Sequence, residues 1–451
     1  MTDQSFMKEK PVLPLVLKMS LPMVISMLVN SLYNIVDSFF VAKIGEDAMT
    51  ALSLIFPLQN LSSAVGVGFG IGINAVVAFY LGAKKQEHAD NAVFSGLILS
   101  ILHGILLCAV CIVCARAFLS VFTDSQSVTE FGLDYFYIVI SFAPVVTLSM
   151  AFEKVFQAVG RMKTTMACLL VGCILNIILD PVLISGFWFI PAMGVRGAAI
   201  ATGIGQTSSL IIYIILFFVK PIGVKFRYTR TEGAKKIFVR MYGVGVSATL
   251  NLALPSFMIT ALNAILAVYS QAYVLILGAY YKLQTFIYFT ANGIVQGIRP
   301  IVGYNFGAGR NDRVRSVFIV TLIMTAAIMA VGTILCLAIP QQLIGLFTEN
   351  PSTVSDGASA LRIICCGFVV SSVSVAVSGV LEGLGKGLPS LVISLIRYIL
   401  IIGVAYALTF AFKAQGVWHA FWITEVLAAA VSVLMYYLSV KRGRTREIDD
   451  C

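Results

Sequence analysis

The chain has 451 residues and a formal net charge of +10, yet only 12% of its residues are charged and 59% are hydrophobic. Soluble globular domains carry about 25% charged residues, so a composition with a mean hydropathy of +0.95 excludes a water-soluble domain. The positive charge does not indicate a nucleic-acid-binding surface, because it is concentrated at the chain ends and in the connections between apolar stretches.

Twelve apolar stretches follow one another along the chain, and each is long enough to cross a bilayer as a helix. They predict an all-α polytopic membrane protein without a separate soluble domain. The first stretch is too long for a signal peptide and no small-residue cleavage site follows it, so we expect all twelve helices to be retained. The predicted spans are residues 13–40, 50–80, 91–117, 131–159, 164–186, 195–219, 238–268, 272–303, 316–340, 357–384, 389–411 and 416–440.

Lysine and arginine are divided unequally between the two sides of this predicted bundle. The N-terminus, the even-numbered connections and the C-terminus hold most of them, for example Lys84, Lys85, Arg310 and Arg313, and the odd-numbered connections hold few. Because positive residues accumulate on the cytoplasmic side, the sequence predicts that both termini are cytoplasmic. An even number of spans agrees with this prediction.

The second half of the chain repeats the first at an offset of 225 positions. LGAKK at residues 81–85 aligns with FGAGR at 306–310, and Phe-Thr-Asp at 122–124 aligns with Phe-Thr-Glu at 347–349. Six helices per half give both halves the same orientation, as in parallel-repeat transporters with a solute cavity between two bundles. We therefore predict two parallel-repeat six-helix bundles. They are an N-lobe at residues 1–219, a basic cytoplasmic linker at 220–237 and a C-lobe with a short basic tail at 238–451.

The first predicted helix carries a row of polar residues in an otherwise apolar sequence. Asn30, Tyr33, Asn34 and Asp37 follow the spacing i, i+3, i+4, i+7, which places them along one helix face. An ionised Asp at the bilayer centre costs about 2.5–3.5 kcal/mol on the insertion scale. Such a residue is therefore a candidate for a proton or cation site.

A second polar pair lies in the fifth predicted helix. Asn176 and Asp180 are four residues apart and share a face, and Thr202 lies a few residues into the sixth helix. Burial and a neighbouring carboxylate both favour the neutral form of a carboxyl group. Asp37, Asn176, Asp180 and Thr202 thus form a predicted oxygen-rich site that could exchange H⁺ or Na⁺ against a cationic solute.

The repeat separates these acids from the scaffold that carries them. At the offset of 225, Asp37 aligns with Leu262 and Asp180 aligns with Ala405. A requirement of the repeated fold should recur in both halves, so the acids indicate a function added to the first half. A structural alternative stays open, in which Asp180 caps a helix break before Pro181, which cannot donate to the preceding turn.

Other polar residues within the predicted helices leave site and structural roles open. Asn30, Glu153, Lys282 and Gln284 are possible cavity or substrate contacts. We expect Lys282 to pair with Glu425 or to face the cavity. Glu153 could instead snorkel or form an ion pair near the cytoplasmic end of its helix.

The sequence contains no nucleophile triad, ATPase signature or zinc motif. Cys108, Cys111 and Cys114 have a metal-like spacing, but they lie in an apolar segment without a nearby acid, which favours a packing role. We therefore expect a protein that is not an enzyme, has no catalytic residues and uses no cofactor apart from a coupling ion.

The sequence resembles the multidrug and toxic compound extrusion (MATE) family over essentially all twelve predicted helices. The similar stretches are SLPMVISMLVNSLYNIVDSFFVAKIG, YLGAKK, QAVGRMK, LNIILDPVLI, GVRGAAIAT, YYKLQTF and PIVGYNFGAGR. The seventh helix has no acid, so the chain is similar to the bacterial DinF-type branch, near the MepA-like pumps.

The resemblance implies export of bulky, mostly cationic amphipathic compounds, driven by inward H⁺ or Na⁺, from a bacterial cytoplasmic (inner) membrane. The expected partners are small amphipathic cations and the lipid bilayer, with no nucleic acid, and the expected functional unit is a monomer. Asp37 matches the acid of the family's first helix, and Tyr33 matches a site tyrosine. Asn176, Asp180 and Thr202 match the family's N-lobe cation site, and Lys282 matches a common basic position without an inferred role.

Two alternatives remain at the level of sequence. One is a major-facilitator drug/H⁺ antiporter, although the usual G-x-x-x-D-R/K-x-G-R/K motif is absent from LGAKKQEHAD. The other is a lipid or lipid-linked sugar flippase of related fold. A flippase needs a cationic cavity for phosphate, for which Lys282, Arg299 and Arg397 are candidates.

Overall fold

The computed structural model describes residues 4–188, 191–230 and 234–446, and the elements within these ranges are helices. The first half comprises α1 (Phe6–Glu9), α2 (Val12–Ala42), α3 (Glu46–Gly82), α4 (Gln86–Leu119), α5 (Gln126–Ser141), α6 (Ala143–Ala158), α7 (Met162–Ser185) and α8 (Val195–Val219). The second half comprises α9 (Ala234–Ala267), α10 (Gln271–Gly307), α11 (Asn311–Ala338), α12 (Pro340–Gly345), α13 (Pro351–Ile364), α14 (Phe368–Gly383), α15 (Gly387–Phe412) and α16 (Ala414–Arg446).

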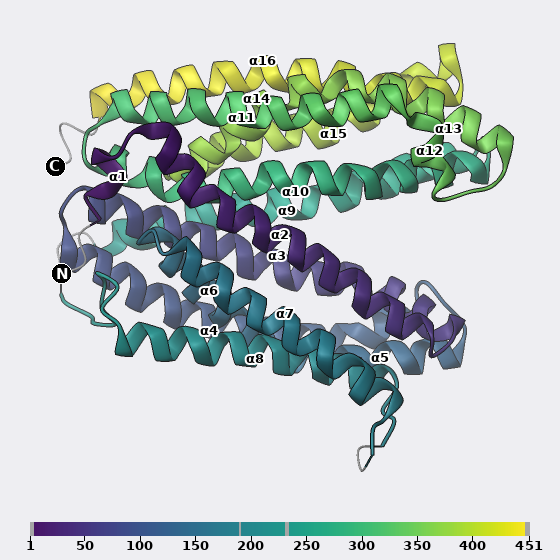
Figure 1. Ribbon diagram of the computed structural model, residues 1–451, viewed down its shortest axis with the longest axis horizontal. Coiled ribbons are helices and arrows are strands. Elements are labelled where there is room, and N and C mark those ends of the chain that lie inside the picture. Colours follow the sequence, from purple (N-terminus) through teal and green to yellow (C-terminus); the bar gives the residue numbers. More distant parts are fainter. Residues whose placement is uncertain (1–3, 189–190, 231–233, 447–451) are drawn as a thin grey trace.

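The helices account for the twelve predicted membrane spans. Ten spans in the described part of the chain are long and apolar enough to cross a membrane, and α5 with α6, bent by 48°, forms an eleventh. The twelfth is α10, a helix of 37 residues that carries Lys282 and Arg299 and runs alongside the others (Figure 1). The prediction of a twelve-helix membrane protein is confirmed.

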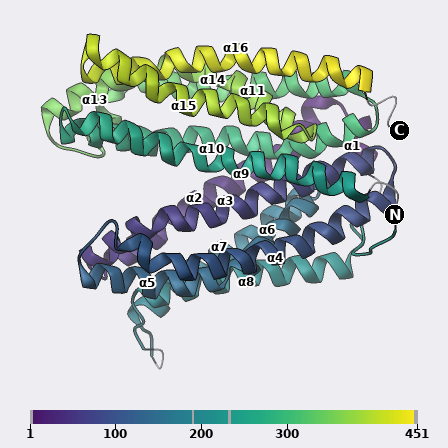
Figure 2. The same cartoon turned by 180° about the vertical axis from the view of Figure 1, so that it is seen from behind.

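The twelve long helices form two bundles, which we call the N-lobe (α2 to α8) and the C-lobe (α9 to α16) (Figure 1). Both chain termini lie at the same end of the molecule, which we call the terminal end. Figures 1 and 2 show the two bundles diverging from the terminal end toward the opposite end.

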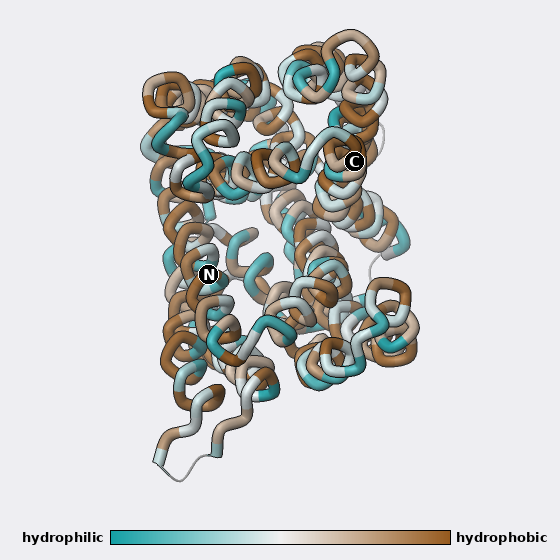
Figure 3. The backbone as a smooth tube through the Cα atoms, turned by 90° about the vertical axis from the view of Figure 1, so that its right-hand side faces the viewer, coloured by the Kyte–Doolittle hydropathy of each residue, from teal (hydrophilic) through white to brown (hydrophobic). Residues whose placement is uncertain are grey.

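The outer surfaces of both bundles are largely apolar, as the view along the helices shows (Figure 3). Large hydrophobic side chains are exposed there, among them Leu106, Ile334 and Phe410. Such faces suit contact with lipid, because helices satisfy their own backbone hydrogen bonds and need no water.

Small residues hold the lobes together near the terminal end. Gly72 of α3 faces the Met241 carbonyl of α9, and its repeat counterpart Gly297 of α10 faces Ser20 of α2, so that a Cβ at either glycine would collide with the opposite lobe. Helices in a membrane associate through such close packing rather than through the hydrophobic effect. The repeat thus produces two equivalent contacts, each joining one lobe to the other.

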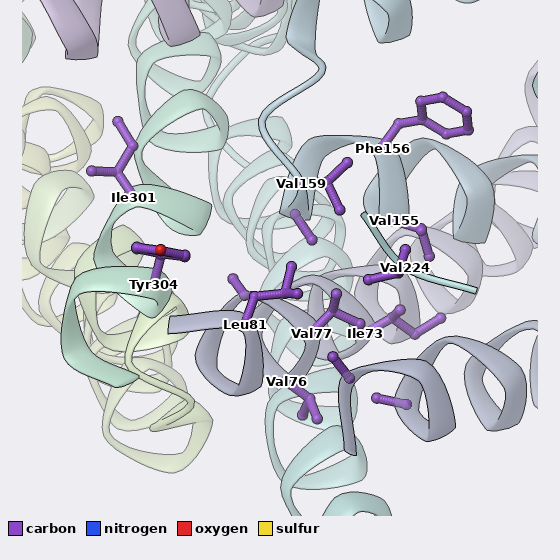
Figure 4. Close-up of a cluster of buried hydrophobic side chains, with 14 of the residues drawn as sticks. Ile73, Val76, Val77, Leu81, Val155, Phe156, Val159, Val224, Ile301 and Tyr304 are labelled. Carbon is purple, nitrogen blue, oxygen red and sulfur yellow. The ribbon is translucent and has the colours of Figure 1, made fainter. Parts of the chain in front are cut away.

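A hydrophobic cluster at this end contains residues from both lobes (Figure 4). Ile73 and Leu81 come from α3, Val155 from α6 and Ile301 from α10, while Val224 lies in the connection between α8 and α9. The terminal end is therefore one packed unit.

Helix α7 continues through Pro181 to Ser185. The alternative of a helix break that Asp180 caps is therefore wrong. A proline within a membrane helix is tolerated where neighbouring helices or side chains compensate the lost backbone hydrogen bond.

Candidate functional site

The packing of α2, α7 and α8 brings the predicted N-lobe residues together. Asp180 is completely buried and Asn176 is 2% exposed, although both lie on membrane-spanning helices. Asp37 is half-buried, and its Oδ1 atom is buried without a hydrogen-bond partner in the described part of the chain. Two carboxyl groups thus lie in an apolar surrounding where charge is costly.

Asn176 links the carboxyl group of Asp180 to the start of α8. In the amide orientation that satisfies both ends, its nitrogen donates to Asp180 Oδ2 at 3.1 Å and its oxygen accepts from the Thr202 backbone N–H at 3.0 Å. This orientation follows from the hydrogen-bond network, because nitrogen and oxygen of an amide are distinguished by their partners. Asn176 therefore fixes the Asp180 side chain relative to α8.

The polar side chains of α2 do not all face the site. Tyr33 lies close to Asp37 and Thr202, so it faces the site. Asn34 is exposed, and its amide nitrogen donates to the Asn30 carbonyl of its own helix at 2.7 Å. The expected participation of Asn34 therefore has no support in these contacts, and Asn30 is half-buried one turn away.

One residue of the site was missed at the level of sequence. Tyr135 of α5 is 3% exposed and lies near Asp37, Tyr33 and Gln59. It occurs in the aromatic segment DYFYIV, where no spacing distinguishes it from a packing residue. Its proximity to the acids is a product of helix packing.

Three other acids on the long helices, Glu153, Glu382 and Glu425, have basic partners. Glu153 Oε1 lies 2.7 Å from the Nζ atom of Lys154, and Glu382 accepts from Arg299 Nε at 2.9 Å. Glu153 is thus paired at the lobe interface, where Lys154 also donates to Gln296 of α10 at 3.1 Å. Among the described residues, Asp37 and Asp180 make no such ion pair.

The C-lobe contains its own buried ionic group. Arg397 of α15 donates through Nε to Glu425 of α16 at 2.7 Å and through Nη2 to the Tyr288 hydroxyl of α10 at 2.7 Å. The Tyr288 hydroxyl in turn donates to Ser371 of α14 at 2.8 Å. Four helices of the C-lobe therefore meet at one neutral ion pair.

The predicted pairing of Lys282 with Glu425 is wrong. Lys282 is exposed, and its ammonium group lies 5.7 Å from the centre of the Phe347 ring. Arg397 takes the place at Glu425 because α15, and not this turn of α10, presents a basic side chain to α16. Gln284, two residues further along α10, is half-buried.

The N-lobe group has the chemistry of a site for a proton or a small cation. Its carboxyl, amide, hydroxyl and phenol groups are oxygen donors, which suit H⁺ and hard cations such as Na⁺. The unpartnered Asp37 Oδ1 supplies a free acceptor. In the described part of the chain, no group of three or more His, Cys, Asp or Glu residues could hold a metal ion.

A family model described as MatE matches residues 22–182 and 247–407. The two matched ranges begin and end 225 positions apart, the offset at which the sequence repeats.

Relatives and solved structures resemble the chain over nearly its full length. The multidrug export protein MepA of Staphylococcus aureus (strain MRSA252) is 25% identical over 434 residues, covering 96% of this chain and 95% of the relative. MepA of Staphylococcus saprophyticus is 26% identical over 424 residues, covering 93% and 92%.

The structural comparisons agree on the fold. A structure described as an outward-facing conformation of a multidrug resistance MATE family transporter has a TM-score of 0.91 at 22% identity, covering 98% of this chain and 99% of that one. A transporter of the MOP superfamily from Pyrococcus furiosus, described as having a binding pocket of reverse polarity, has a TM-score of 0.90 at 22% identity, covering 99% of both chains.

Proposed function

This chain belongs to the MatE family, and we propose that it is a secondary active antiporter that exports amphipathic, mostly cationic compounds in exchange for inward H⁺ or Na⁺. The family and its relatives support a multidrug efflux transporter and not an enzyme. Membership of this family also removes the major-facilitator alternative.

One observation carries the coupling part of the proposal. Asp37 and Asp180, the first half-buried and the second completely buried, are acids on membrane-spanning helices without a basic partner among the described residues, whereas Glu153, Glu382 and Glu425 each have one. An uncompensated carboxylate in a membrane is expensive and is expected where charge moves. Such a pair is most stable after it has taken up a proton or a cation.

The residues around the acids have different roles in binding the ion. Asp37 and Asp180 supply negative charge, and the unpartnered Asp37 Oδ1 is free to accept a proton or coordinate Na⁺. Asn176 and Thr202 hold the geometry of Asp180 and can contribute oxygen atoms. Tyr33 and Tyr135 add two phenol groups next to the acids.

The ion and the cationic solute are exchanged because both are attracted by the negative charge of Asp37 and Asp180. When the acids are neutralised from the outside, the N-lobe no longer attracts a cationic solute and releases it. When the ion leaves to the cytoplasm, the restored negative charge favours binding of the next solute. Rocking of two bundles about a shared packed end provides access to each side in turn.

The placement in the cell follows from the same reasoning. A multi-pass membrane protein is supported by the spans and the family. The bacterial cytoplasmic membrane, cytoplasmic termini and action as a monomer complete the proposal, with the basic residues Lys84, Arg310 and Arg313 on the cytoplasmic side.

The flippase alternative is less well supported. Its cavity needs free positive charge for phosphate, yet Arg299 and Arg397 are both engaged by glutamates. The remaining candidate, Lys282, lies over Phe347.

Purified protein in liposomes loaded with a fluorescent lipophilic cation tests the proposal. A pH gradient and a Na⁺ gradient are imposed separately, for the wild type and for Asp180→Asn. We expect efflux driven by one gradient and lost in the variant. Absence of gradient-driven efflux in the wild type would refute antiport and direct the next assay to a lipid substrate.

A further inference from the structure

A short segment before the first long helix, residues 4–11, contacts the C-lobe. We call it the N-terminal strap. Its Met7 is completely buried, and the Met7 carbonyl accepts hydrogen bonds from Asn305 Nδ2 at 3.0 Å and from Arg313 Nη2 at 3.2 Å. Arg313 also donates to the Lys10 carbonyl at 2.7 Å. Asn305 and Arg313 lie on α10 and α11, so the strap is anchored to the C-lobe although it leads into α2.

The same strap packs against the N-lobe. Gly160, with a φ of +80°, lies in the turn between α6 and α7, and a Cβ there would meet the Phe6 ring at 2.6 Å and the Met7 methyl group at 2.7 Å. Gln4 donates to the Ile222 carbonyl at 3.3 Å. One buried methionine therefore bridges both lobes at the terminal end.

The connection between α8 and α9 is instead held on the lobe from which it emerges. We call its residues 220–230 the linker strap. Lys225 donates through its backbone N–H to Asp90 Oδ1 at 2.9 Å, and Thr229 exchanges two hydrogen bonds with the Asn91 side chain, both at 2.7 Å. Asp90 and Asn91 lie on α4 of the N-lobe, although the linker strap leads into α9 of the C-lobe.

The two straps are not counterparts in the repeat. At the offset of 225, residues 4–11 correspond to 229–236, of which only 229 and 230 belong to the linker strap. At the offset of 225, Asn305 and Arg313 correspond to Tyr80 and His88, which contact each other with ring centres 5.0 Å apart. The anchors of the N-terminal strap are therefore not a by-product of the duplicated scaffold.

We infer that the N-terminal strap is a latch on the terminal end, and that its anchors set how often the lobes separate there. The inference rests on the alternating access of the proposed function. Separation at this end must withdraw Met7 from its buried position and break the hydrogen bonds from Asn305 and Arg313. Because these contacts exist only while the ends are together, they stabilise that state selectively. Arg313 contributes charge-assisted bonds, which are the stronger kind.

A buried serine between the lobes is a suitable position for a cysteine that reports separation of the lobes. Ser20 of α2 is 1% exposed, donates to the Ile294 carbonyl of α10 at 3.2 Å, and is covered by Gly297. Ser20→Cys is nearly isosteric and becomes reachable only when the lobes part at the terminal end. Ser209→Cys is the matched control probe, because Ser209 is buried within the N-lobe alone, donating to the Cys168 carbonyl.

The experiment measures maleimide labelling of the full-length chain in inside-out membrane vesicles, with a membrane-impermeant reagent. Labelling is read by mass spectrometry on the peptide that carries the probe, so the native cysteines stay in place. Each probe is combined with Arg313→Ala, Asn305→Ala or Asn91→Ala. Arg310→Ala is the control variant, because Arg310 pairs with Asp312 at 3.0 Å in the same turn.

We expect Arg313→Ala to raise the labelling rate at residue 20 about tenfold, with a smaller increase for Asn305→Ala. Asn91→Ala should cause no increase, because the bonds of Asn91 join the linker strap to the lobe from which it emerges. Labelling at residue 209 should stay at the wild-type rate in every variant. Labelling at residue 20 should stay at the wild-type rate in Arg310→Ala. Equal increases at both probes would show general loosening and overturn the inference, as would an unchanged rate at residue 20 in Arg313→Ala. Neither readout depends on substrate or ion, so failure of the antiport proposal is recognised separately in liposomes.

Discussion

Both lobes carry charged side chains on corresponding helices, but among the described residues only the C-lobe pairs its acid there with a basic residue. In the N-lobe, α7 and α8 carry Asp180, Asn176 and Thr202, and the acid has no basic partner among the described residues. In the C-lobe, α15 and α16 carry Arg397 and Glu425, which neutralise each other. Duplicated scaffolds thus keep their packing while their polar interiors diverge.

Local packing explains why neither arrangement occurs twice. Arg397 corresponds to Gly172, where a Cβ would already collide with Ser209 of α8. Asp180 corresponds to Ala405, which is completely buried in the C-lobe core. A single substitution cannot transfer either group, because each depends on the space that its own neighbours leave. The contrast predicts that the C-lobe pair mainly stabilises the fold and that the N-lobe acids mainly serve transport.

Removing one member of the C-lobe pair should give the largest effect. Arg397→Met leaves Glu425 buried without its partner, which costs about 3–5 kcal/mol of stability. The measurement is thermal unfolding of the protein in detergent. Arg397→Met combined with Glu425→Gln should recover much of the loss, and an unchanged midpoint in the single variant would contradict a stabilising pair.

The N-lobe acid should show the reverse pattern. Asp180→Asn should reduce gradient-driven efflux by about 100-fold, as expected for loss of a coupling free energy of about 3 kcal/mol. Its unfolding midpoint should not fall, because a neutral amide is easier to bury than a carboxylate. Asp134→Asn is the matched control, since the Asp134 side chain is 40% exposed and pairs with Arg196 at 2.9 Å. Normal efflux by Asp180→Asn would remove this residue from the coupling site.

A substitution at Asn176 tests the side chain that positions Asp180 and leaves Asp180 itself unchanged. Asn176→Ala removes the link between Asp180 and the Thr202 backbone, so the apparent affinity for the coupling ion should fall about tenfold. Efflux at saturating gradient should be largely kept. The measurement is efflux as a function of the driving gradient, and an equal loss at every gradient would indicate a folding defect instead.

Lys282 should give the smallest effect and completes the contrast with Arg397. Lys282→Ala removes a contact with the Phe347 ring at an exposed position, worth less than about 1 kcal/mol. Its unfolding midpoint should therefore stay close to that of the wild type. A drop as large as that of Arg397→Met would show that Lys282, and not Arg397, supports Glu425.

Features that depend on a local residue pattern were predictable from the amino-acid sequence. Apolar length gave the twelve spans, which the helices and the family confirm. The offset of 225 gave the two halves, and the same offset separates the two matches to the family model. Helical spacing placed Asn176 and Asp180 on one face, because residues four apart are neighbours within a single helix.

The contacts of side chains between helices became apparent from the packed helices alone. The partner of Glu425 is Arg397 and not Lys282, and Tyr135 joins the acidic site. The crossing of the N-terminal strap, with Met7 buried between the lobes, also has no signal in the sequence. Such contacts depend on the rotation and depth of each helix relative to the others. These are set by the close packing of all twelve helices together, and no spacing within one segment encodes them.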